Sequence, residues 1–370
     1  MASTAKHDWP MVPLLEIAED VTRGHKKVPK SAYEEEGSTP IVDQSMDFIC
    51  GYTDEVPTLV SPPYIVFGDH TRELKHIDFA FVPGADGVKV LKPAEGIEPK
   101  FLYYYLQAHP VKDLGYSRHF KLLKELSISL PPLVEQRRIA AILDEVGALI
   151  AKVGTEMSNL QKTQQSRLDG VFRHFPQAPL RMYVESIQSG KSLKEASTND
   201  VRNRVLKISS VTSGTFEPEE SKPLPDDYIP PEAHRVQKGD VLVSRANTAD
   251  LVGASVLVME EVSNLYLPDK LWRLNLTQGT RPAAIVGILQ NAVVRSRISA
   301  KASGSGGSMK NITQKAFLQV LVPNMCTSEQ VELSNFLFEI GRVRKLLTQK
   351  KTLLETLQRS LSARAFQGEL

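Results

Sequence analysis

Apolar residues recur at alternating intervals of three and four positions in two long segments of the chain. In the segment 130–172 they fall at Ile139, Ile142, Val146, Leu149, Val153 and Leu160. In the segment 322–366 they fall at Leu333, Phe336, Ile340, Val343, Leu347, Leu354, Leu357 and Leu361. This spacing is typical of the seam of a coiled coil. The pattern therefore predicts two long helices that pack along these seams.

The two helical segments are copies of each other. At a spacing of 194 residues, Glu135-Gln136 matches Glu329-Gln330, and Phe172 matches Phe366. The apolar positions of the two seams match at the same spacing. An internal repeat of this kind decides the architecture of a chain, because each copy builds one structural unit.

A weaker repeat extends upstream of each helix. Pro13-Leu14 matches Pro179-Leu180 at a spacing of 166 residues, and Arg118-His119-Phe120 matches Lys310-Asn311-Ile312 at a spacing of 192. The chain therefore divides into two halves, each a globular unit followed by a long helix. The predicted domains are 1–132, 133–175, 176–327 and 328–370.

The direction of the two helices follows from the short connections. A brief link joins the first helix to the second globular unit, and that unit leads directly into the second helix. Because the ends of a domain often lie close together, we expect the second helix to begin near the end of the first. The two helices would then run antiparallel, with a pseudo-two-fold axis near Val153 and Leu347.

The globular units contain short strand-like runs separated by Gly, Pro and Asp turns. In the first unit the expected elements are strands at Thr39–Val42, Tyr64–Phe67, Asp78–Val82 and Val88–Leu91 and a helix at Phe101–Gln107. In the second they are strands at Val205–Ser210, Asp240–Ser244, Ala254–Val258 and Leu271–Leu276 and a helix at Pro282–Gln290. The predicted fold class is α+β: two mixed α/β domains joined by two long antiparallel coiled-coil helices in a pseudo-two-fold repeat.

Composition narrows the class of protein. Hydrophobic residues make up 41% and charged residues 24% of the 370 residues, which is ordinary for a globular protein. No apolar run of about 18 residues and no apolar signal core occur, so we expect a cytoplasmic protein without a membrane span. Cys50 and Cys326 are the two cysteines, which excludes a disulfide scaffold and a cysteine zinc site. The eight histidines are scattered, with no H-x-x-x-H pair or His/Asp cluster on a predicted helix, so no metal site is expected.

Two short motifs suggest enzymatic chemistry on first sight. Ser61-Pro62-Pro63-Tyr64 resembles the catalytic loop of DNA amino-methyltransferases, which bonds the amino group of a flipped base. However, no glycine-rich loop for S-adenosylmethionine follows a strand, so a proline turn is the simpler interpretation. Gly304–Lys310 lacks the Gly-Lys-Ser/Thr ending of a phosphate loop. It is either a surface loop or a backbone segment that approaches DNA phosphates closely.

The segment LPPLVEQRRIAAIL, followed by a heptad helix and occurring twice after divergent α/β units, resembles the specificity subunit of type I restriction–modification systems. The second copy, VPNMCTSEQVEL, departs from the pattern because it lacks the double proline and carries a two-residue insertion. The resemblance implies that each globular unit is a target recognition domain for one half of an asymmetric bipartite DNA site. The helices would set the spacer and dock two methyltransferase subunits.

The same resemblance implies where the chemistry lies. The chain itself would be non-catalytic and would hold no cofactor. S-adenosylmethionine would belong to the partner methyltransferase subunit, and ATP and Mg would belong to two translocase–nuclease restriction subunits, where these are present.

The net charge of +2 means that any DNA contact must use local basic patches. Arginine on a loop bonds guanine, and asparagine bonds adenine. On this basis the candidate DNA-binding residues are Arg23, Lys26, Lys27, Arg72, Arg118, Arg245, Asn247, Lys310 and Asn311.

Three other interpretations stay open. Any one basic cluster is often no more than a solvated face. The chain could also be a free-standing methyltransferase that uses Ser61–Tyr64, or a coiled-coil adaptor that binds no DNA.

Overall fold

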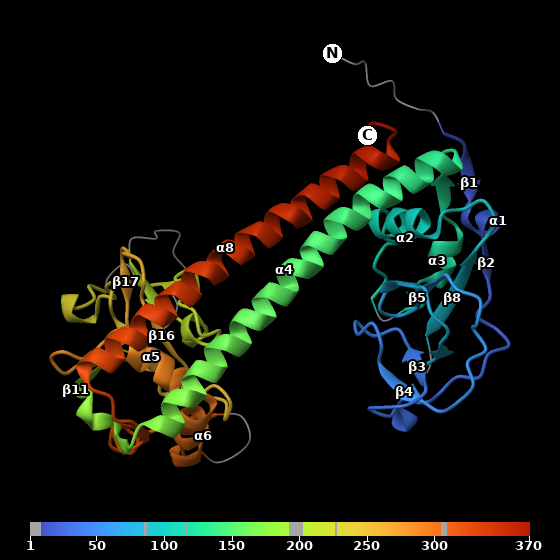
Figure 1. Ribbon diagram of the computed structural model, residues 1–370. Helices are drawn as coiled ribbons and strands as arrows, with labels where there is room; N and C mark the ends of the chain where they lie inside the picture. The colour runs from blue at the N-terminus through green and yellow to red at the C-terminus, as the bar shows by residue number, and fades with distance from the viewer. Residues whose placement is uncertain (1–8, 85–86, 116, 192–202, 226–227, 305–308) are drawn as a thin grey trace. The chain divides into compact units, whose positions relative to one another are not determined.

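The computed structural model describes residues 9–84, 87–115, 117–191, 203–225, 228–304 and 309–370 (Figure 1). The chain divides into two compact units, one formed by residues 1–155 and 348–370 and the other by residues 156–347. Two long helices, α4 (Leu133–His174) and α8 (Thr327–Phe366), each contribute one part to either unit.

Among its described residues, the first unit contains three small sheets. The largest is antiparallel and has the order β2 (Ala18–Asp20), β8 (Val88–Pro93), β5 (Tyr64–Gly68) and β6 (Leu74–Ile77). The second has the order β4 (Gly51–Thr53), β3 (Thr39–Val42) and β7 (Val82–Pro83), and the third pairs β1 (Met11–Pro13) with β9 (Ser127–Ser129). Its helical elements are α1 (Leu14–Ile17), η1 (Lys30–Ala32), α2 (Pro99–Ala108) and α3 (Phe120–Lys124).

The second unit repeats this plan. Its largest sheet has the order β11 (Val184–Ser189), β18 (Leu271–Leu276), β14 (Val241–Ser244) and β16 (Ser255–Leu257). The next has the order β13 (Ser221–Pro223), β12 (Arg204–Leu206) and β17 (Leu265–Tyr266), and two pairs join β10 (Gln177–Pro179) to β20 (Leu321–Pro323) and β15 (Ala246–Asn247) to β19 (Lys310–Asn311). Its helical elements are η2 (Leu180–Met182), η3 (Ile208–Val211), η4 (Glu232–His234), α5 (Pro282–Gln290), α6 (Ala292–Lys301) and α7 (Gln314–Leu318).

Strand order and register show that the two units are structural copies. In both four-stranded sheets, each of the two central strands lies between two antiparallel neighbours. Each three-stranded sheet contains one parallel pair, which is β3 with β7 in the first unit and β12 with β17 in the second. In the pairs β1–β9 and β10–β20, β1 and β10 match at the predicted spacing of 166, and β9 and β20 match at 194, the spacing of the long helices. The predicted spacing of 192 before the second helix is wrong. The His119 N–H donates to Asp69 O, and the Ile312 N–H donates to Arg245 O at the equivalent position, which is a spacing of 193.

The Glu-Gln pair of the repeated motif has a defined structural task. Gln136 is buried at the start of α4, where its Oε1 accepts the Glu98 N–H at 2.9 Å and its Nε2 donates to Pro131 O at 2.9 Å. Glu98 caps the N-terminus of α2, whose first N–H groups have no partner within the helix. The glutamine therefore fastens the long helix to the short helix on the sheet.

The second copy repeats the same connection. Gln330 is buried, its Oε1 accepts the Arg281 N–H at 3.0 Å, and its Nε2 donates to Met325 O at 3.0 Å. Arg281 caps α5, which lies beside β16 as α2 lies beside β6 (Figure 1). We name this arrangement the glutamine clamp; it explains why the motif recurs before each helix.

Each unit has its own apolar core, and both long helices enter it. In the first unit, Phe101 of α2 and Leu143 of α4 pack in one cluster with Phe366 of α8. In the second unit, Trp272 of β18 packs in one cluster with Leu168 of α4 and Leu333 of α8. Burial of these large side chains is the main term that stabilises each unit.

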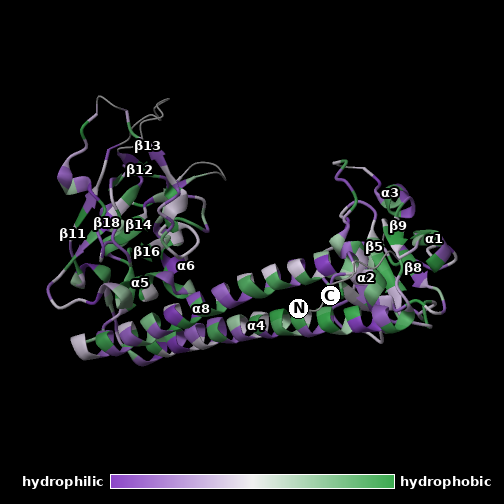
Figure 2. Cartoon of the chain, turned by 90° about the horizontal axis from the view of Figure 1, so that it is seen from above, coloured by the Kyte–Doolittle hydropathy of each residue, from purple (hydrophilic) through white to green (hydrophobic). Residues whose placement is uncertain are grey.

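Within each unit, α4 and α8 run in opposite directions. In the first unit, Arg138 near the start of α4 donates to Leu370 O, just beyond the end of α8, at 3.1 Å. In the second unit, Arg344 in the middle of α8 donates to Gln164, and Arg167 lies 4.0 Å from Glu332 near the start of α8. Hydrophobic and polar positions alternate along both helices in Figure 2.

The predicted seam residues differ in burial. Those that are buried are Ile139, Val146, Val153, Leu333 and Ile340. Those that are partly buried are Ile142, Leu160, Phe336, Leu347, Leu354 and Leu361. Leu149, Val343 and Leu357 are exposed. Near the start of α4 the buried stripe also takes in Ala140 and Leu143, because α2 covers that side of the helix.

Two predicted strands are wrong in part. Asp78–Val82 is not one strand: β6 ends at Ile77, and β7 begins at Val82. In β6 the charged Lys75 is buried while Leu74 is partly exposed, so the apolar alternation that marks a strand is missing. The predicted strand Val205–Ser210 ends at Leu206, because the Ser210 hydroxyl donates to Lys207 O and closes a turn.

Candidate nucleic-acid interface

Four of the nine candidate DNA-binding residues meet on one short ribbon in the second unit. β15 pairs antiparallel with β19, so that Ala246 faces Asn311 and Asn247 faces Lys310. Arg245, directly before β15, accepts the Ile312 N–H at 3.0 Å through its backbone oxygen. Segments separated by more than sixty positions in the sequence therefore bring two cations and two amides together.

The cations of this ribbon are not neutralised by acids. In the part of the second unit that the structure describes, neither Arg245 nor Lys310 forms an ion pair, and neither does Lys270, whose backbone oxygen accepts the Arg245 N–H at 3.0 Å. The Nε of Arg245 is buried without a hydrogen-bond partner. Cations without acidic partners suit the phosphates of DNA, and amides beside them, one half-buried and one exposed, suit base edges.

Helix α6 fixes the loop that follows β15. Ser299 donates its hydroxyl to Ala249 O at 2.8 Å, and Arg295 donates to Asp250 O at 2.6 Å. Burial lowers the pKa of Arg295, an effect that the nearby Asp250 opposes. Lys310 reaches the same helix, since its Nζ lies 3.5 Å from Ser299 O. Hydrogen bonds to α6 therefore connect the ribbon and the loop into one edge.

Amide orientation on the ribbon is also set locally. Asn247 accepts the Thr248 N–H through Oδ1 at 2.9 Å, which turns its amide relative to the backbone. Asn311 is exposed, and its backbone exchanges two hydrogen bonds of 2.8 Å with Ser303. Of the candidate segment Gly304–Lys310, residues 305–308 lie outside the described residues.

The five candidates of the first unit do not gather in this way. Lys26 pairs with Glu55 at 2.5 Å, and Arg72 pairs with Asp113 at 2.6 Å. Arg23, Lys27 and Arg118 are exposed. Arg23, Lys26 and Lys27 lie in one segment after β2, Arg72 and Arg118 lie in two others, and two of the five candidates are already bound to carboxylates.

Hydrogen bonds join the turn that carries Arg72 to the segment that carries Arg118. His70 Nδ1 lies 3.2 Å from Ser117 O. The buried His119 ring is held by Asp69 O at 3.0 Å and by the Leu114 N–H at 3.0 Å. In this arrangement Nδ1 faces the Asp69 carbonyl and Nε2 faces the Leu114 N–H, so both ring nitrogens are bonded to the backbone.

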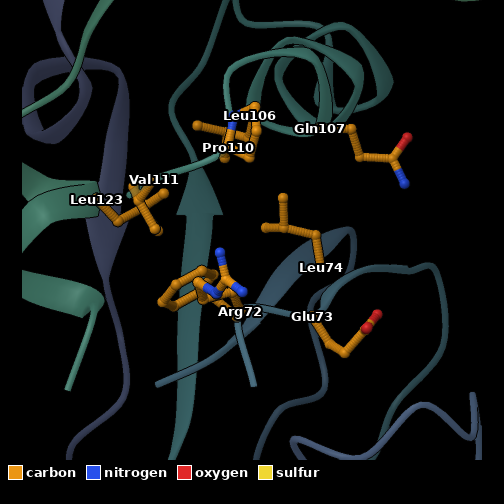
Figure 3. Close-up of a pocket in the computed structure, with 9 residues that line it drawn as sticks. Arg72, Glu73, Leu74, Leu106, Gln107, Pro110, Val111 and Leu123 are labelled. Carbon is orange, nitrogen blue, oxygen red and sulfur yellow. The ribbon is translucent and has the colours of Figure 1, made fainter. Parts of the chain in front are cut away.

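A pocket of about 170 Å³ opens beside these turns (Figure 3). Arg72 and Glu73 lie at its polar side, and Leu106, Val111 and Leu123 line its apolar side (Figure 3). Small-molecule sites usually have volumes of roughly 300 Å³ or more. The pocket is therefore too small for a nucleotide-sized cofactor.

The Ser61–Tyr64 motif forms a turn into β5. Tyr64 is 4% exposed, its hydroxyl accepts the Ser61 N–H at 3.1 Å, and its ring packs against Phe81 at a centroid distance of 5.9 Å. A ring buried in this way cannot stack on a flipped base. Within the described ranges, no group of three or more His, Cys, Asp or Glu side chains is arranged to hold a metal. Among the same residues, no helix combines the length and apolarity that crossing a membrane requires.

Two copies of one α/β unit, each continued by a long helix, define an internally repeated two-domain class of protein. Residues 6–159 match the family model of the type I restriction modification DNA specificity domain. The chain is similar to the specificity subunits of type I restriction enzymes, as the repeated motif predicts.

Two relatives illustrate the extent of this similarity. The EcoEI specificity subunit of Escherichia coli is 34% identical over 122 residues, which cover 33% of this chain and 20% of that subunit. The EcoKI specificity subunit of Escherichia coli strain K12 is 26% identical over 321 residues, which cover 76% of this chain and 68% of that subunit. The aligned part of this chain thus spans a fifth of the length of the first relative and about two thirds of the length of the second.

Solved structures confirm the predicted fold class. The S subunit of a type I restriction–modification system from M. genitalium has a TM-score of 0.64 at 13% identity, with 99% of both chains covered. A chain from a study of complex assembly and conformational transition of the type I R-M system has a TM-score of 0.53 at 16% identity, with 98% of both chains covered. Likeness at this level of identity concerns the fold.

Proposed function

We propose that the chain is the sequence-specific DNA-recognition subunit of a type I restriction–modification complex. Each α/β unit would read one half of an asymmetric bipartite DNA site. The observation that carries the proposal is the β15–β19 ribbon, where Arg245 and Lys310, which form no ion pair among the described residues, lie beside the amides of Asn247 and Asn311. The similarity of the chain to specificity subunits supports the same conclusion.

The long helices would dock two methyltransferase subunits and set the spacer between the half-sites. Exposed apolar side chains on α8 support docking: in the first unit, Leu353 and Leu357 are exposed and lie four positions apart, on one face of the helix. Exposed apolar side chains in a row are typical of protein interaction surfaces.

The chain would be non-catalytic and cytoplasmic. S-adenosylmethionine would be held by the methyltransferase subunits, and ATP and Mg by restriction subunits if the system contains them. The burial of Tyr64 supports this division, because it removes the one aromatic side chain of the methyltransferase-like motif from contact with a base.

Reconstitution tests the proposal. The purified chain should methylate no DNA, and addition of its methyltransferase subunit should produce adenine methylation in a bipartite motif. Arg245→Ala should relax one position of the second half-site by about 1–3 kcal/mol. Lys310→Ala should weaken binding to all sequences and reduce its salt dependence.

Lys238→Ala is the matched control, because Lys238 is an exposed lysine on a turn of the same unit outside the ribbon. It should leave the motif unchanged. Methylation by the chain alone, or methylation by the complex without sequence preference, would contradict the proposal.

A further inference from the structure

A buried lysine distinguishes the first unit from the second. Lys75 of β6 is 5% exposed, its Nζ donates to Asp43 O at 2.9 Å, and it also donates to Asp47 O. Lys75 faces Val66 in the sheet, and the equivalent residue of the second unit, which faces Leu242, is the fully buried Val256. Burial of an ammonium group is costly unless it is bonded, so this lysine holds the loop between β3 and β4.

The carboxylate of Asp43 fixes the same loop from the other side. It accepts the Ser45 N–H at 2.8 Å, the Cys50 thiol proton at 2.8 Å and the Tyr33 hydroxyl proton at 3.2 Å. Burial acts to raise the pKa of Asp43, but these hydrogen bonds outweigh it and the pKa is lowered. The loop Gln44–Phe48 is therefore anchored at its base by a carboxylate and a buried ammonium group.

The tip of this anchored loop is apolar and faces solvent. Met46 is 84% exposed, and Phe48 is 50% exposed with its ring 5.9 Å from that of Phe79. An apolar tip contributes little to the core, and a loop that merely connected two strands would not need a buried charge to shape it. This combination is typical of a contact surface.

The loop lies against the turn that follows β5. Its Gln44 O accepts the Thr71 hydroxyl at 2.6 Å, and its Gln44 Oε1 accepts the His70 N–H at 3.1 Å. Two glycines permit this approach. A Cβ on Gly68 would lie 3.0 Å from the Gln44 Cβ, and a Cβ on Gly84 would lie 2.6 Å from the Asp43 Cβ.

This turn is the counterpart of the Arg245–Asn247 segment. Gly68 faces Val88 at the end of β5, as Ser244 faces Leu271 at the end of β14. The residue after Gly68 is Asp69, which stands where the second unit has Arg245, and its buried carboxylate accepts the Phe120 N–H at 2.8 Å. The first unit therefore has Asp69 at the position of Arg245, and the loop Gln44–Phe48 lies beside this turn.

We propose that the loop Gln44–Phe48 is the base-reading element of the first unit. In this proposal Met46 makes an apolar contact with the C5-methyl group of a thymine in the major groove. This inference rests on the proposed DNA-recognition function. A thymine presents a C5-methyl group in the major groove, and apolar side chains discriminate it by contact. The rigid base of the loop limits the entropy lost on binding.

The test uses the complete complex and maps the methylated motif for three variants. Met46→Ala should reduce methylation of the cognate site by about tenfold and relax one T·A position of the first half-site. Lys75→Met removes the buried anchor and should relax several positions of the same half-site. Val56→Ala is the control, since Val56 is 82% exposed on a different loop and should leave the motif unchanged.

In every variant the second half-site should stay as it is, which also reports that the complex is assembled. An unchanged motif with Met46→Ala and Lys75→Met would overturn the inference, and so would weaker assembly of the complex with an unchanged motif. Those outcomes leave the proposed function intact. A wild-type complex that methylates without sequence preference would instead remove the proposed function itself.

Discussion

The glutamine clamp offers a quantitative test of how each long helix is fastened to its unit. Gln330→Met keeps the length of the side chain but removes both hydrogen bonds. The Arg281 N–H and the Met325 carbonyl, now bonded to Gln330 at 3.0 Å each, lose their partner next to a side chain that is 4% exposed. Since methionine can replace neither bond, both backbone groups must stay unpaired or admit water.

The expected loss of unfolding free energy follows from these two unpaired backbone groups. A buried polar group left without its partner costs about 1–3 kcal/mol. Methionine regains part of this through its apolar surface, so the free energy of unfolding of the second unit should fall by about 2–4 kcal/mol. With a urea dependence of roughly 2 kcal/mol per molar, the midpoint should fall by about 1–2 M.

The two tryptophans allow the units to be followed separately. Trp9 belongs to the first unit, and Trp272 is buried in the core of the second. In a Trp9→Phe background, fluorescence reports the second unit alone during urea unfolding. Gln161→Met is the matched control, because Gln161 lies exposed on α4 within the second unit.

A urea midpoint for Gln330→Met equal to that of Gln161→Met would refute the argument that the glutamine clamp stabilises the second unit. Gln136→Met should shift the Trp272 transition less than Gln330→Met does, because its partners Glu98 and Pro131 lie in the first unit.

Two further predictions concern the helices and the response to pH. A four-residue insertion near Thr163–Ser166 lengthens α4 by about 6 Å. At 3.4 Å per base pair, the spacer of the mapped methylation motif should grow by one or two base pairs, with both half-sites unchanged. An active variant with the original spacer would show that the helices do not set the distance between the half-sites. Burial, reinforced by Lys100, lowers the pKa of His76, so the folded state disfavours its protonation and the unfolding free energy should fall as pH drops below about 6.5. His76→Gln should flatten this slope between pH 7.5 and pH 5, and equal slopes would contradict the assignment.

The sequence predicted elements best where local pattern and tertiary packing agree. The helix Pro282–Gln290 is found with its predicted bounds, because proline at its first turn and an unbroken apolar run leave no other choice. β6 was not predicted because the charged Lys75 is buried, where it bonds the backbone of the loop between β3 and β4. A charge that faces the interior reverses the pattern from which strands are predicted.

The candidate interface was predictable by residue type but not by arrangement. Arg245 and Asn247 carry the chemistry of base readout in the sequence, yet only the pairing of β15 with β19 brings Lys310 and Asn311 beside them. In the first unit the same reasoning selected Lys26 and Arg72, which are bound to Glu55 and Asp113. Composition alone cannot distinguish a cation that is already paired from one that is available, because the partner lies far away in the sequence.

The central claim is that the two units read two half-sites independently. Its most direct test replaces residues 176–327 with the second unit of another specificity subunit and maps the methylated motif of the reconstituted complex. The account predicts that one half of the bipartite motif changes while the other half stays as in the wild type. A change in both halves, or in neither, would contradict it.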